Sequence, residues 1–267
     1  MKNTIVFIHG MFQNPKSWEK WMDFYTAKGY SCIAVAWPLH EGDPSVLREH
    51  SPDGLGKLTL DEVITKVETL IYSLTEKPIV IGHSVGGLIV QLLVNREIVK
   101  AGVAISSVAP NAMIDFSWPF IKNAAIIANP LKGDEPIDMD LETFHEAFAN
   151  TLSEAEAEIA FKATATNDSR VIFRDCMGKS GQLDVNIPHP PLLFIAGEKD
   201  QICPADLVEK NANAYTDPSS LTYFEEFPNR SHFICNEPGW EEVATSVYNW
   251  LQNHEQTIAQ EDPGLFK

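Results

Sequence analysis

The segment Gly82-His83-Ser84-Val85-Gly86 places one serine hydroxyl between glycines, directly after a short β-branched run. A serine in a Gly-x-Ser-x-Gly pattern can act as a nucleophile when it lies on a sharp turn from a strand to a helix. Such a turn imposes an unfavourable backbone conformation on the serine, and the glycines remove side chains that would collide with the strand and helix. The alternative interpretation is a glycine-rich structural turn that contains a serine by chance.

The elements around this motif favour the nucleophile. Residues 79–81 form a buried-looking strand and residues 85–96 an apolar helix. The same alternation along much of the chain predicts a parallel sheet covered by helices on both faces. The other expected strands are residues 4–8, 32–37, 103–107, 192–196 and 221–227. The other expected helices are residues 18–28, 59–74, 204–214 and 240–252, with Thr59 and Glu62 forming a capping box.

Two regions interrupt the alternation. Residues 39–58 are rich in Gly, Pro, Asp and His, which predicts a loop. Between residues 110 and 188 no further strand–helix unit is expected, although residues 141–152 and 155–165 have helical patterns. This second region therefore has the character of an inserted segment of helices and loops.

With these motifs in place, the chain resembles the α/β-hydrolase superfamily over nearly its whole length, and within it the compact serine esterase and hydroxynitrile-lyase-like group. The residues GHSVGG are similar to the family's nucleophile elbow, and VFIHG, with Trp18 eight residues after its glycine, is similar to its oxyanion segment. The resemblance implies a mostly parallel doubly wound sheet that begins at the family's third strand. It also implies a core of residues 1–110 and 189–255, a helical cap insertion at 111–188 and a flexible tail at 256–267.

A general base must take the proton of the serine, and histidine is suited to this role near neutral pH. Of the eight histidines, His232 lies in a loop between a late strand and the last helix, and loops at the carboxyl ends of strands gather catalytic groups. The family's histidine occupies this place. The resemblance therefore implies that His232 is the base, whereas His9 and His83 are expected to shape their own turns.

The acid that orients this histidine is expected directly after the strand at residues 192–196. The order Ser84, Asp200, His232 matches the order in the hydrolase family, which selects Asp200. Glu198 is a nearby rival that comes early in the loop by comparison with the family. Asp115 is an alternative, because some family members place the acid after the preceding strand.

The resemblance also implies an oxyanion hole and a substrate-binding cap. The backbone N–H groups of Met11 and Val85 are the expected donors. Four aromatic residues are candidate substrate contacts: Phe12, Phe116, Trp118 and Phe148. Core packing is the alternative explanation for these aromatic side chains.

Composition limits the remaining possibilities. The chain has 267 residues, 44% of them hydrophobic, which predicts one large globular domain. A net charge of −17 argues against nucleic acid as a partner. The four cysteines form no Cys-x-x-Cys pair. The apolar run near the N-terminus is too short for the apolar region of a signal peptide, and no later segment is apolar enough to span a membrane. A cytoplasmic protein is therefore expected. No metal-binding or phosphate-binding motif is present, and no cofactor is implied.

The sequence thus predicts a serine hydrolase that cleaves carboxylic esters of small or medium apolar substrates through an acyl-enzyme. Alternatives that use the same fold and residues are lactone, thioester or C–C bond hydrolysis, acyl transfer and cyanohydrin cleavage. A non-catalytic small-molecule receptor is a further alternative, argued by analogy of fold alone. Oligomeric state has no signature in the sequence.

Overall fold

A computed structural model describes residues 3–113 and 132–260, and within them six parallel strands form one sheet in the order β2-β1-β3-β4-β7-β8. The strands are β1 (Thr4–Ile8), β2 (Ser31–Val35), β3 (Ile79–His83), β4 (Ala101–Ile105), β7 (Leu192–Gly197) and β8 (Thr222–Phe227). Every residue of β3, β4 and β7 is buried. This explains their continuous apolar character, because strands covered on both faces have no solvent side.

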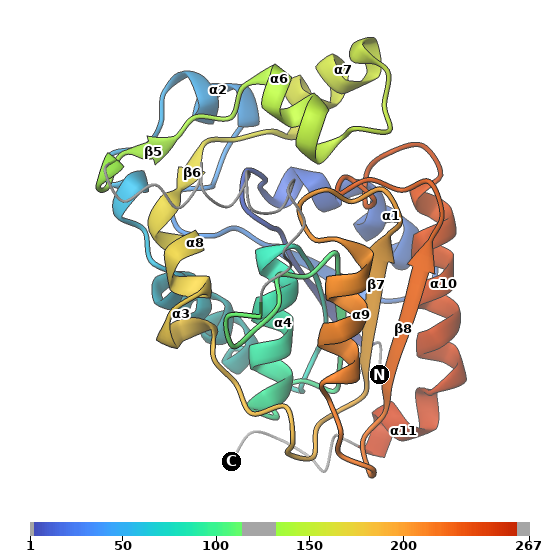
Figure 1. Cartoon of the computed structure of the whole chain (residues 1–267). Helices are drawn as coiled ribbons and strands as arrows, with labels where there is room; N and C mark the ends of the chain where they lie inside the picture. Colours follow the sequence, from blue (N-terminus) through green and yellow to red (C-terminus); the bar gives the residue numbers. More distant parts are fainter. Residues whose placement is uncertain (1–2, 114–131, 261–267) are drawn as a thin grey trace.

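Helices cover both faces of the sheet (Figure 1). One face packs against α3 (Leu60–Tyr72), α4 (Val85–Asn95) and α9 (Ala205–Asn213), and the other against α1 (Glu19–Ala27) and α10 (Trp240–Asn253). Alternate residues of β1 enter the two cores: Val6 and Ile8 face α4, whereas Ile5 and Phe7 face α1. The expected α/β fold, with a parallel sheet covered on both sides, is confirmed.

The strands of the sheet and the helices that pack on it begin and end within two residues of the bounds expected from the sequence. The expected capping box of α3 is present, since the N–H of Glu62 donates to Thr59 Oγ1 at 3.3 Å and the N–H of Thr59 donates to Glu62 Oε2 at 2.9 Å. These two bonds satisfy N–H groups that a helix start otherwise leaves unpaired.

The segment between β4 and β7 carries α6 (Leu141–Thr143), a π-helical turn (Phe144–Phe148) and α7 (Glu154–Thr164), and Figure 1 shows α6 and α7 across one end of the sheet. Its last helix, α8 (Arg170–Cys176), lies beside α3. Two-residue strands, β5 (Pro136–Ile137) and β6 (Asp168–Ser169), pair antiparallel within the same segment. These strands were not expected from the sequence, because two residues are too few to show a period.

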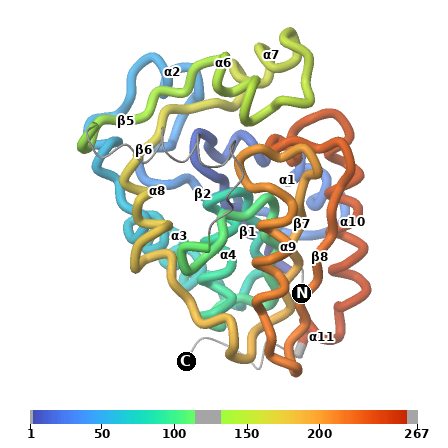
Figure 2. Tube along the Cα trace, in the orientation of Figure 1, coloured from blue at the N-terminus to red at the C-terminus, as the bar shows by residue number. Residues whose placement is uncertain are grey.

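Residues 39–58 are not wholly a loop, and this expectation is corrected. Helix α2 (Pro44–Glu49) begins after Asp43, whose carboxylate accepts the N–H of Ser45 at 2.9 Å, and Pro44 occupies its first turn. The helix packs against α7 and lies along the top of Figure 2. Two segments of the chain therefore cover this end of the sheet: α2, and the stretch from α6 to the end of α7. We call them together the roof.

Beyond α10 the chain continues as α11 (Glu255–Gln260), where the side chain of Ile258 is buried against the α1 and α10 face. This helix occupies the first part of the segment expected to be a flexible tail. Of the helices in the described part of the chain, none combines the length and apolar character needed to cross a bilayer.

Candidate active site

Ser84 lies where β3 ends and α4 begins, with φ 57° and ψ −119°. A non-glycine residue with this positive φ is strained and is held only by its surroundings. The N–H of Ser84 donates to the carbonyl of Ile105 at 2.9 Å, and its carbonyl accepts the N–H of Val108 at 3.1 Å. Both partners belong to β4 or the loop after it, so the neighbouring strand fixes the serine turn.

Close backbone approach requires two of the glycines around the serine. A Cβ at Gly86 would lie 2.3 Å from the carbonyl oxygen of Ile8, and a Cβ at Gly10 would lie 2.7 Å from Ser84 Cβ. Both distances are far below ordinary van der Waals contact. The absence of side chains therefore lets the turn after β1 lie directly against Ser84.

Asp200 and His232 form a buried pair at the same end of the sheet. His232 Nδ1–H donates to Asp200 Oδ2 at 2.8 Å, and neither side chain is exposed. The other carboxylate oxygen of Asp200 accepts the N–H groups of Ile202 and Cys203, each at 2.8 Å. Glu198, the rival acid, is exposed and instead pairs with Lys199 and the N–H of Asn229.

The histidine loop is anchored from both sides. The buried carboxylate of Glu237 accepts the N–H of Ser231 at 3.1 Å and its hydroxyl at 2.9 Å. The N–H of Phe233 donates to the carbonyl of Phe148 at 2.9 Å. Thr151 also donates to Glu237, so the roof segment and the histidine loop share one anchor. Sequence reasoning missed Glu237, since a lone acid in a loop gives no signal of burial.

His83 connects the serine turn to the histidine loop. Its Nε2–H donates to the carbonyl of His232 at 2.8 Å, and the two rings lie 4.6 Å apart. Burial, reinforced by the neighbouring His232, holds the pKa of His83 well below its ordinary value. His83 is therefore a neutral donor that holds the histidine loop, whereas the sequence indicated that it shapes its own turn.

His232 Nε2 is buried and has no hydrogen-bond partner in residues 3–113 and 132–260, so no such bond joins it to Ser84 Oγ. Hydrogen bonds between catalytic groups are often long before substrate binds and tighten in the complex. With Nδ1 committed to Asp200, Nε2 is the ring nitrogen that is open to receive a proton.

The two expected oxyanion donors flank this turn. Val85 is the first residue of α4, where N–H groups have no intrahelical acceptor, and Met11 follows Gly10 beside Ser84. Neither N–H has an acceptor within the described ranges. His9 Nδ1–H donates to the carbonyl of Gly10 at 2.9 Å, which fixes the peptide unit that carries the Met11 N–H.

The aromatic candidates divide between described and undescribed positions. The ring of Phe148 lies 4.7 Å from that of His232 in an edge-on arrangement, and the side chains of Phe148 and Phe12 are both buried. Phe116 and Trp118 fall outside the described residues, as does the alternative acid Asp115.

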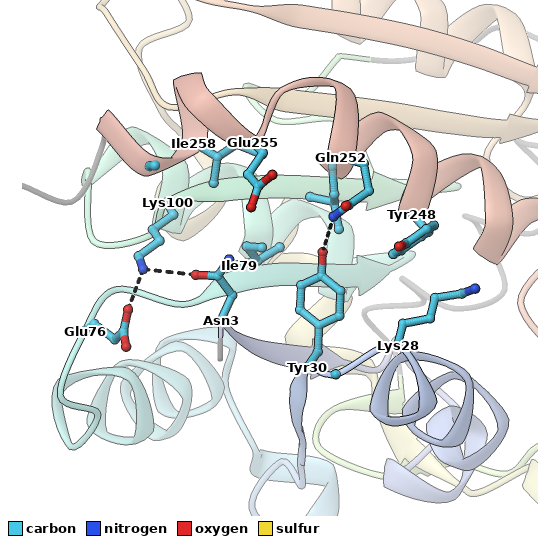
Figure 3. A pocket seen from close by; sticks show the side chains of 13 residues that line it. Asn3, Lys28, Tyr30, Glu76, Ile79, Lys100, Tyr248, Gln252, Glu255 and Ile258 are labelled. Carbon is cyan, nitrogen blue, oxygen red and sulfur yellow. Dashed lines mark hydrogen bonds and ion pairs between the residues drawn. The ribbon is translucent and has the colours of Figure 1, made fainter. Parts of the chain in front are cut away.

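A cavity of about 460 Å³ lies away from this site (Figure 3). Asn3 and Lys100, which line it, immediately precede β1 and β4, so the cavity is at the amino ends of the strands, opposite Ser84. Lys100 Nζ pairs with Glu76 at 2.6 Å there. The residues that line it include no serine or histidine, and we assign it no chemistry.

These features define an α/β protein with a strained serine and a buried histidine–carboxylate pair at the carboxyl ends of parallel strands. Residues 5–245 match the model of the alpha/beta hydrolase family, and the chain belongs to this family. A comparison with curated protein sequences gives no match.

Solved structures show the same fold at low sequence identity. A monoacylglycerol lipase from Paleococcus ferrophilus is 20% identical, with TM-score 0.67 and 94% of each chain covered. An extracellular alpha/beta-hydrolase from a Paenibacillus species is 16% identical, with TM-score 0.69, covering 92% of this chain and 98% of that one. The methylesterase MES16 from Arabidopsis is 15% identical, with TM-score 0.64, covering 95% and 99%.

Proposed function

We propose that this protein is a serine hydrolase that cleaves carboxylic esters of small or medium apolar substrates through an acyl-enzyme. The observation that carries the proposal is the 2.8 Å hydrogen bond from His232 Nδ1 to Asp200, which leaves Nε2 as the open nitrogen of a ring that lies 4.6 Å from the ring of His83, the residue before the strained Ser84. An oriented imidazole beside a serine on a strained turn is the arrangement that activates a hydroxyl as a nucleophile.

In the proposed reaction His232 Nε2 takes the proton of Ser84 as Oγ attacks the ester carbonyl. The N–H groups of Met11 and Val85 donate to the oxyanion that forms. The imidazolium, stabilised by Asp200, then returns the proton to the leaving alcohol as the ester C–O bond breaks. Water, deprotonated by the same nitrogen, then attacks the acyl-enzyme; the acyl bond to Ser84 Oγ breaks as the imidazolium returns the proton to Oγ, and the carboxylic acid is released.

The preference for an apolar acyl group rests on the residues around the site. Phe148 packs against the imidazole, and Met11 and Phe12 follow the turn that contacts Ser84. The lipase and the methylesterase among the structural neighbours support ester chemistry, although they act on their own substrates. Ester, thioester, lactone and amide panels separate this proposal from other reactions of the same fold.

Ser84→Ala is expected to fold normally and to lose activity by on the order of 10⁴- to 10⁶-fold, because no other group can form the acyl-enzyme. The assay uses p-nitrophenyl esters from acetyl to dodecanoyl, together with labelling by a fluorophosphonate probe. Ser73→Ala, a change at an exposed serine, is the matched control. Turnover of no ester, or labelling that survives in Ser84→Ala, would contradict the proposal.

A further inference from the structure

A second buried carboxylate–imidazole pair lies beside the candidate site. His40 Nε2 is 3.3 Å from Asp168 Oδ2, and the two side chains are 1% and 0% exposed. His40 Nδ1 lies 3.0 Å from the carbonyl oxygen of Pro38. Nδ1 faces a carbonyl oxygen and therefore carries a hydrogen, whereas Nε2 makes no hydrogen bond within the described residues but lies at ion-pair distance from the carboxylate, which favours the imidazolium form of His40. Because a buried ion pair is costly to desolvate, this pair is weak evidence for added stability, and we therefore ask what else Asp168 and His40 do.

The carboxylate of Asp168 also binds the turn after β1. Its Oδ2 accepts the N–H of Phe12 at 2.8 Å, and its Oδ1 accepts the N–H of Ser169 at 2.6 Å. Phe12 is also bound through its carbonyl, which accepts the N–H of Thr166 at 2.9 Å. Phe12 has φ 62°, a strained value for a bulky residue that these bonds hold in place.

The peptide unit between Gly10 and Met11 is anchored as well. His9 Nδ1–H donates to the carbonyl of Gly10, and in a trans peptide the N–H of Met11 points the opposite way. His9 Nε2 in turn accepts the N–H of Trp37 at 3.3 Å, and the His9 ring lies 5.5 Å from that of His40. Met11 is therefore flanked by two peptide units, one held by His9 and the other by Asp168.

We propose that Asp168, held by His40, is a positioning residue for the oxyanion hole: it fixes the Met11–Phe12 turn so that the Met11 N–H faces the developing oxyanion at Ser84. This proposal rests on the proposed function. Asp168 contacts neither substrate nor the reacting atoms, and it acts through the Phe12 N–H. A carboxylate suits the task, because a charge-assisted hydrogen bond is shorter and about twice as strong as a neutral one.

Asp168→Asn removes this function with little change in volume. The carboxylate presents one oxygen to Phe12 and one to Ser169, whereas an amide has a single oxygen and must turn its NH₂ toward one of these donors. We expect kcat for a p-nitrophenyl ester to fall about 10- to 100-fold, part of the effect of losing an oxyanion donor, while KM stays within about two-fold. His40→Gln, which keeps a donor near Asp168 but removes the charge, is expected to show a smaller loss in kcat.

A readout independent of activity accompanies the kinetics. Hydrogen exchange at the Phe12 amide is expected to rise about 10- to 100-fold in Asp168→Asn, because the bond that protects it is weakened. Asp175→Asn is the matched control: Asp175, also on the inserted segment, accepts a backbone N–H, that of Leu60, at 3.0 Å, but at the start of α3. This control should change neither kcat nor exchange at Phe12.

The outcomes separate the two proposals. Failure of Ser84→Ala to abolish turnover would overturn the proposed function, and exchange at Phe12 would still decide whether Asp168 holds the turn. Unchanged exchange in Asp168→Asn, an unchanged kcat, or a loss that appears only in KM would each overturn the positioning role. Rapid exchange with a lower kcat and a constant KM would support it.

Discussion

At the scale of single residues, the two buried carboxylate–imidazole pairs, Asp200 with His232 and Asp168 with His40, differ in the surroundings of the ring nitrogen that points away from the carboxylate. His232 donates from Nδ1 to Asp200, and its Nε2 has no hydrogen-bond partner among the described residues. In His40 the nitrogen away from the carboxylate, Nδ1, faces the carbonyl of Pro38 at 3.0 Å, while Nε2 lies 3.3 Å from Asp168 at ion-pair distance without a hydrogen bond. The same two residue types are thus suited to proton transfer in one place and to a fixed charge in the other.

Asp200→Asn tests the role of the first pair. Oδ1 of the new side chain can still accept the N–H groups of Ile202 and Cys203, so the loop should fold. Its NH₂ would then face His232 Nδ1 and force the tautomer that carries hydrogen on Nε2, which cannot accept a proton from Ser84. We expect kcat to fall on the order of 10⁴-fold, with an unchanged melting temperature, in a p-nitrophenyl ester assay.

The control for this change is Asp206→Asn, which alters an exposed carboxylate on α9 in the same way. Full activity in Asp200→Asn would mean that another residue is the acid that orients His232. Asp115, the alternative from the sequence, would be the next to replace.

At the scale of elements, the two segments of the roof are held together by a side chain that binds the end of a helix. Arg48, on α2, donates to the carbonyls of Phe161, at 3.0 Å, and Ala165 at the carboxyl end of α7. The Phe161 carbonyl also accepts the N–H of Ala165 at 3.0 Å, so Arg48 reinforces the hydrogen bonding that ends the helix. A cation at this end also complements the helix dipole.

Arg48→Met should therefore loosen the end of α7 without unfolding the sheet. The thioether keeps part of the packing on Phe161, but the hydrogen bonds are lost. Allowing for the partial exposure of Arg48, we expect a local cost of roughly 1 to 2 kcal/mol, or exchange about 10-fold faster in the last turn of α7. Peptide-level hydrogen exchange measures this, with α3 as the internal reference. Lys162→Met removes an exposed cation in the same turn, where it pairs with Glu158, and should speed that exchange by much less than Arg48→Met.

At the scale of the whole molecule, the sheet and the serine turn were predictable because their signals are local. Each buried strand is an uninterrupted apolar run, and the glycines at 82 and 86 mark a close approach whatever the rest of the fold. Helix α2 was missed, although Asp43 before Pro44 is a recognisable helix start. The Asp168–His40 pair could not be predicted, because no local sequence pattern around either residue indicates contact with a residue more than 100 positions away.

Buried neutral histidines also give the whole molecule a dependence on pH. Burial, with His40 adding to it, holds the pKa of His9 well below its ordinary value, and burial lowers that of His83. Below about pH 6.5 the unfolded chain binds a proton at each of these positions and the folded chain does not, so stability falls as pH falls. Burial opposes the charge on His40, but Asp168 outweighs it and raises the pKa of His40. His40 is thus protonated in both states below that pH and adds no slope there.

Between pH 6.5 and 5.5, each of the two neutral histidines should lower the free energy of unfolding by up to about 1.4 kcal/mol per pH unit. Urea denaturation across this range measures the slope. His83→Gln, whose amide can still donate to the carbonyl of His232, should reduce the slope by about that amount, because one proton-binding difference is removed. His50→Gln, at an exposed position, is the matched control. A slope in His83→Gln equal to that of the unmodified protein would mean that His83 takes up its proton in the folded state. Its donation to His232 would then persist at acid pH as a charged hydrogen bond.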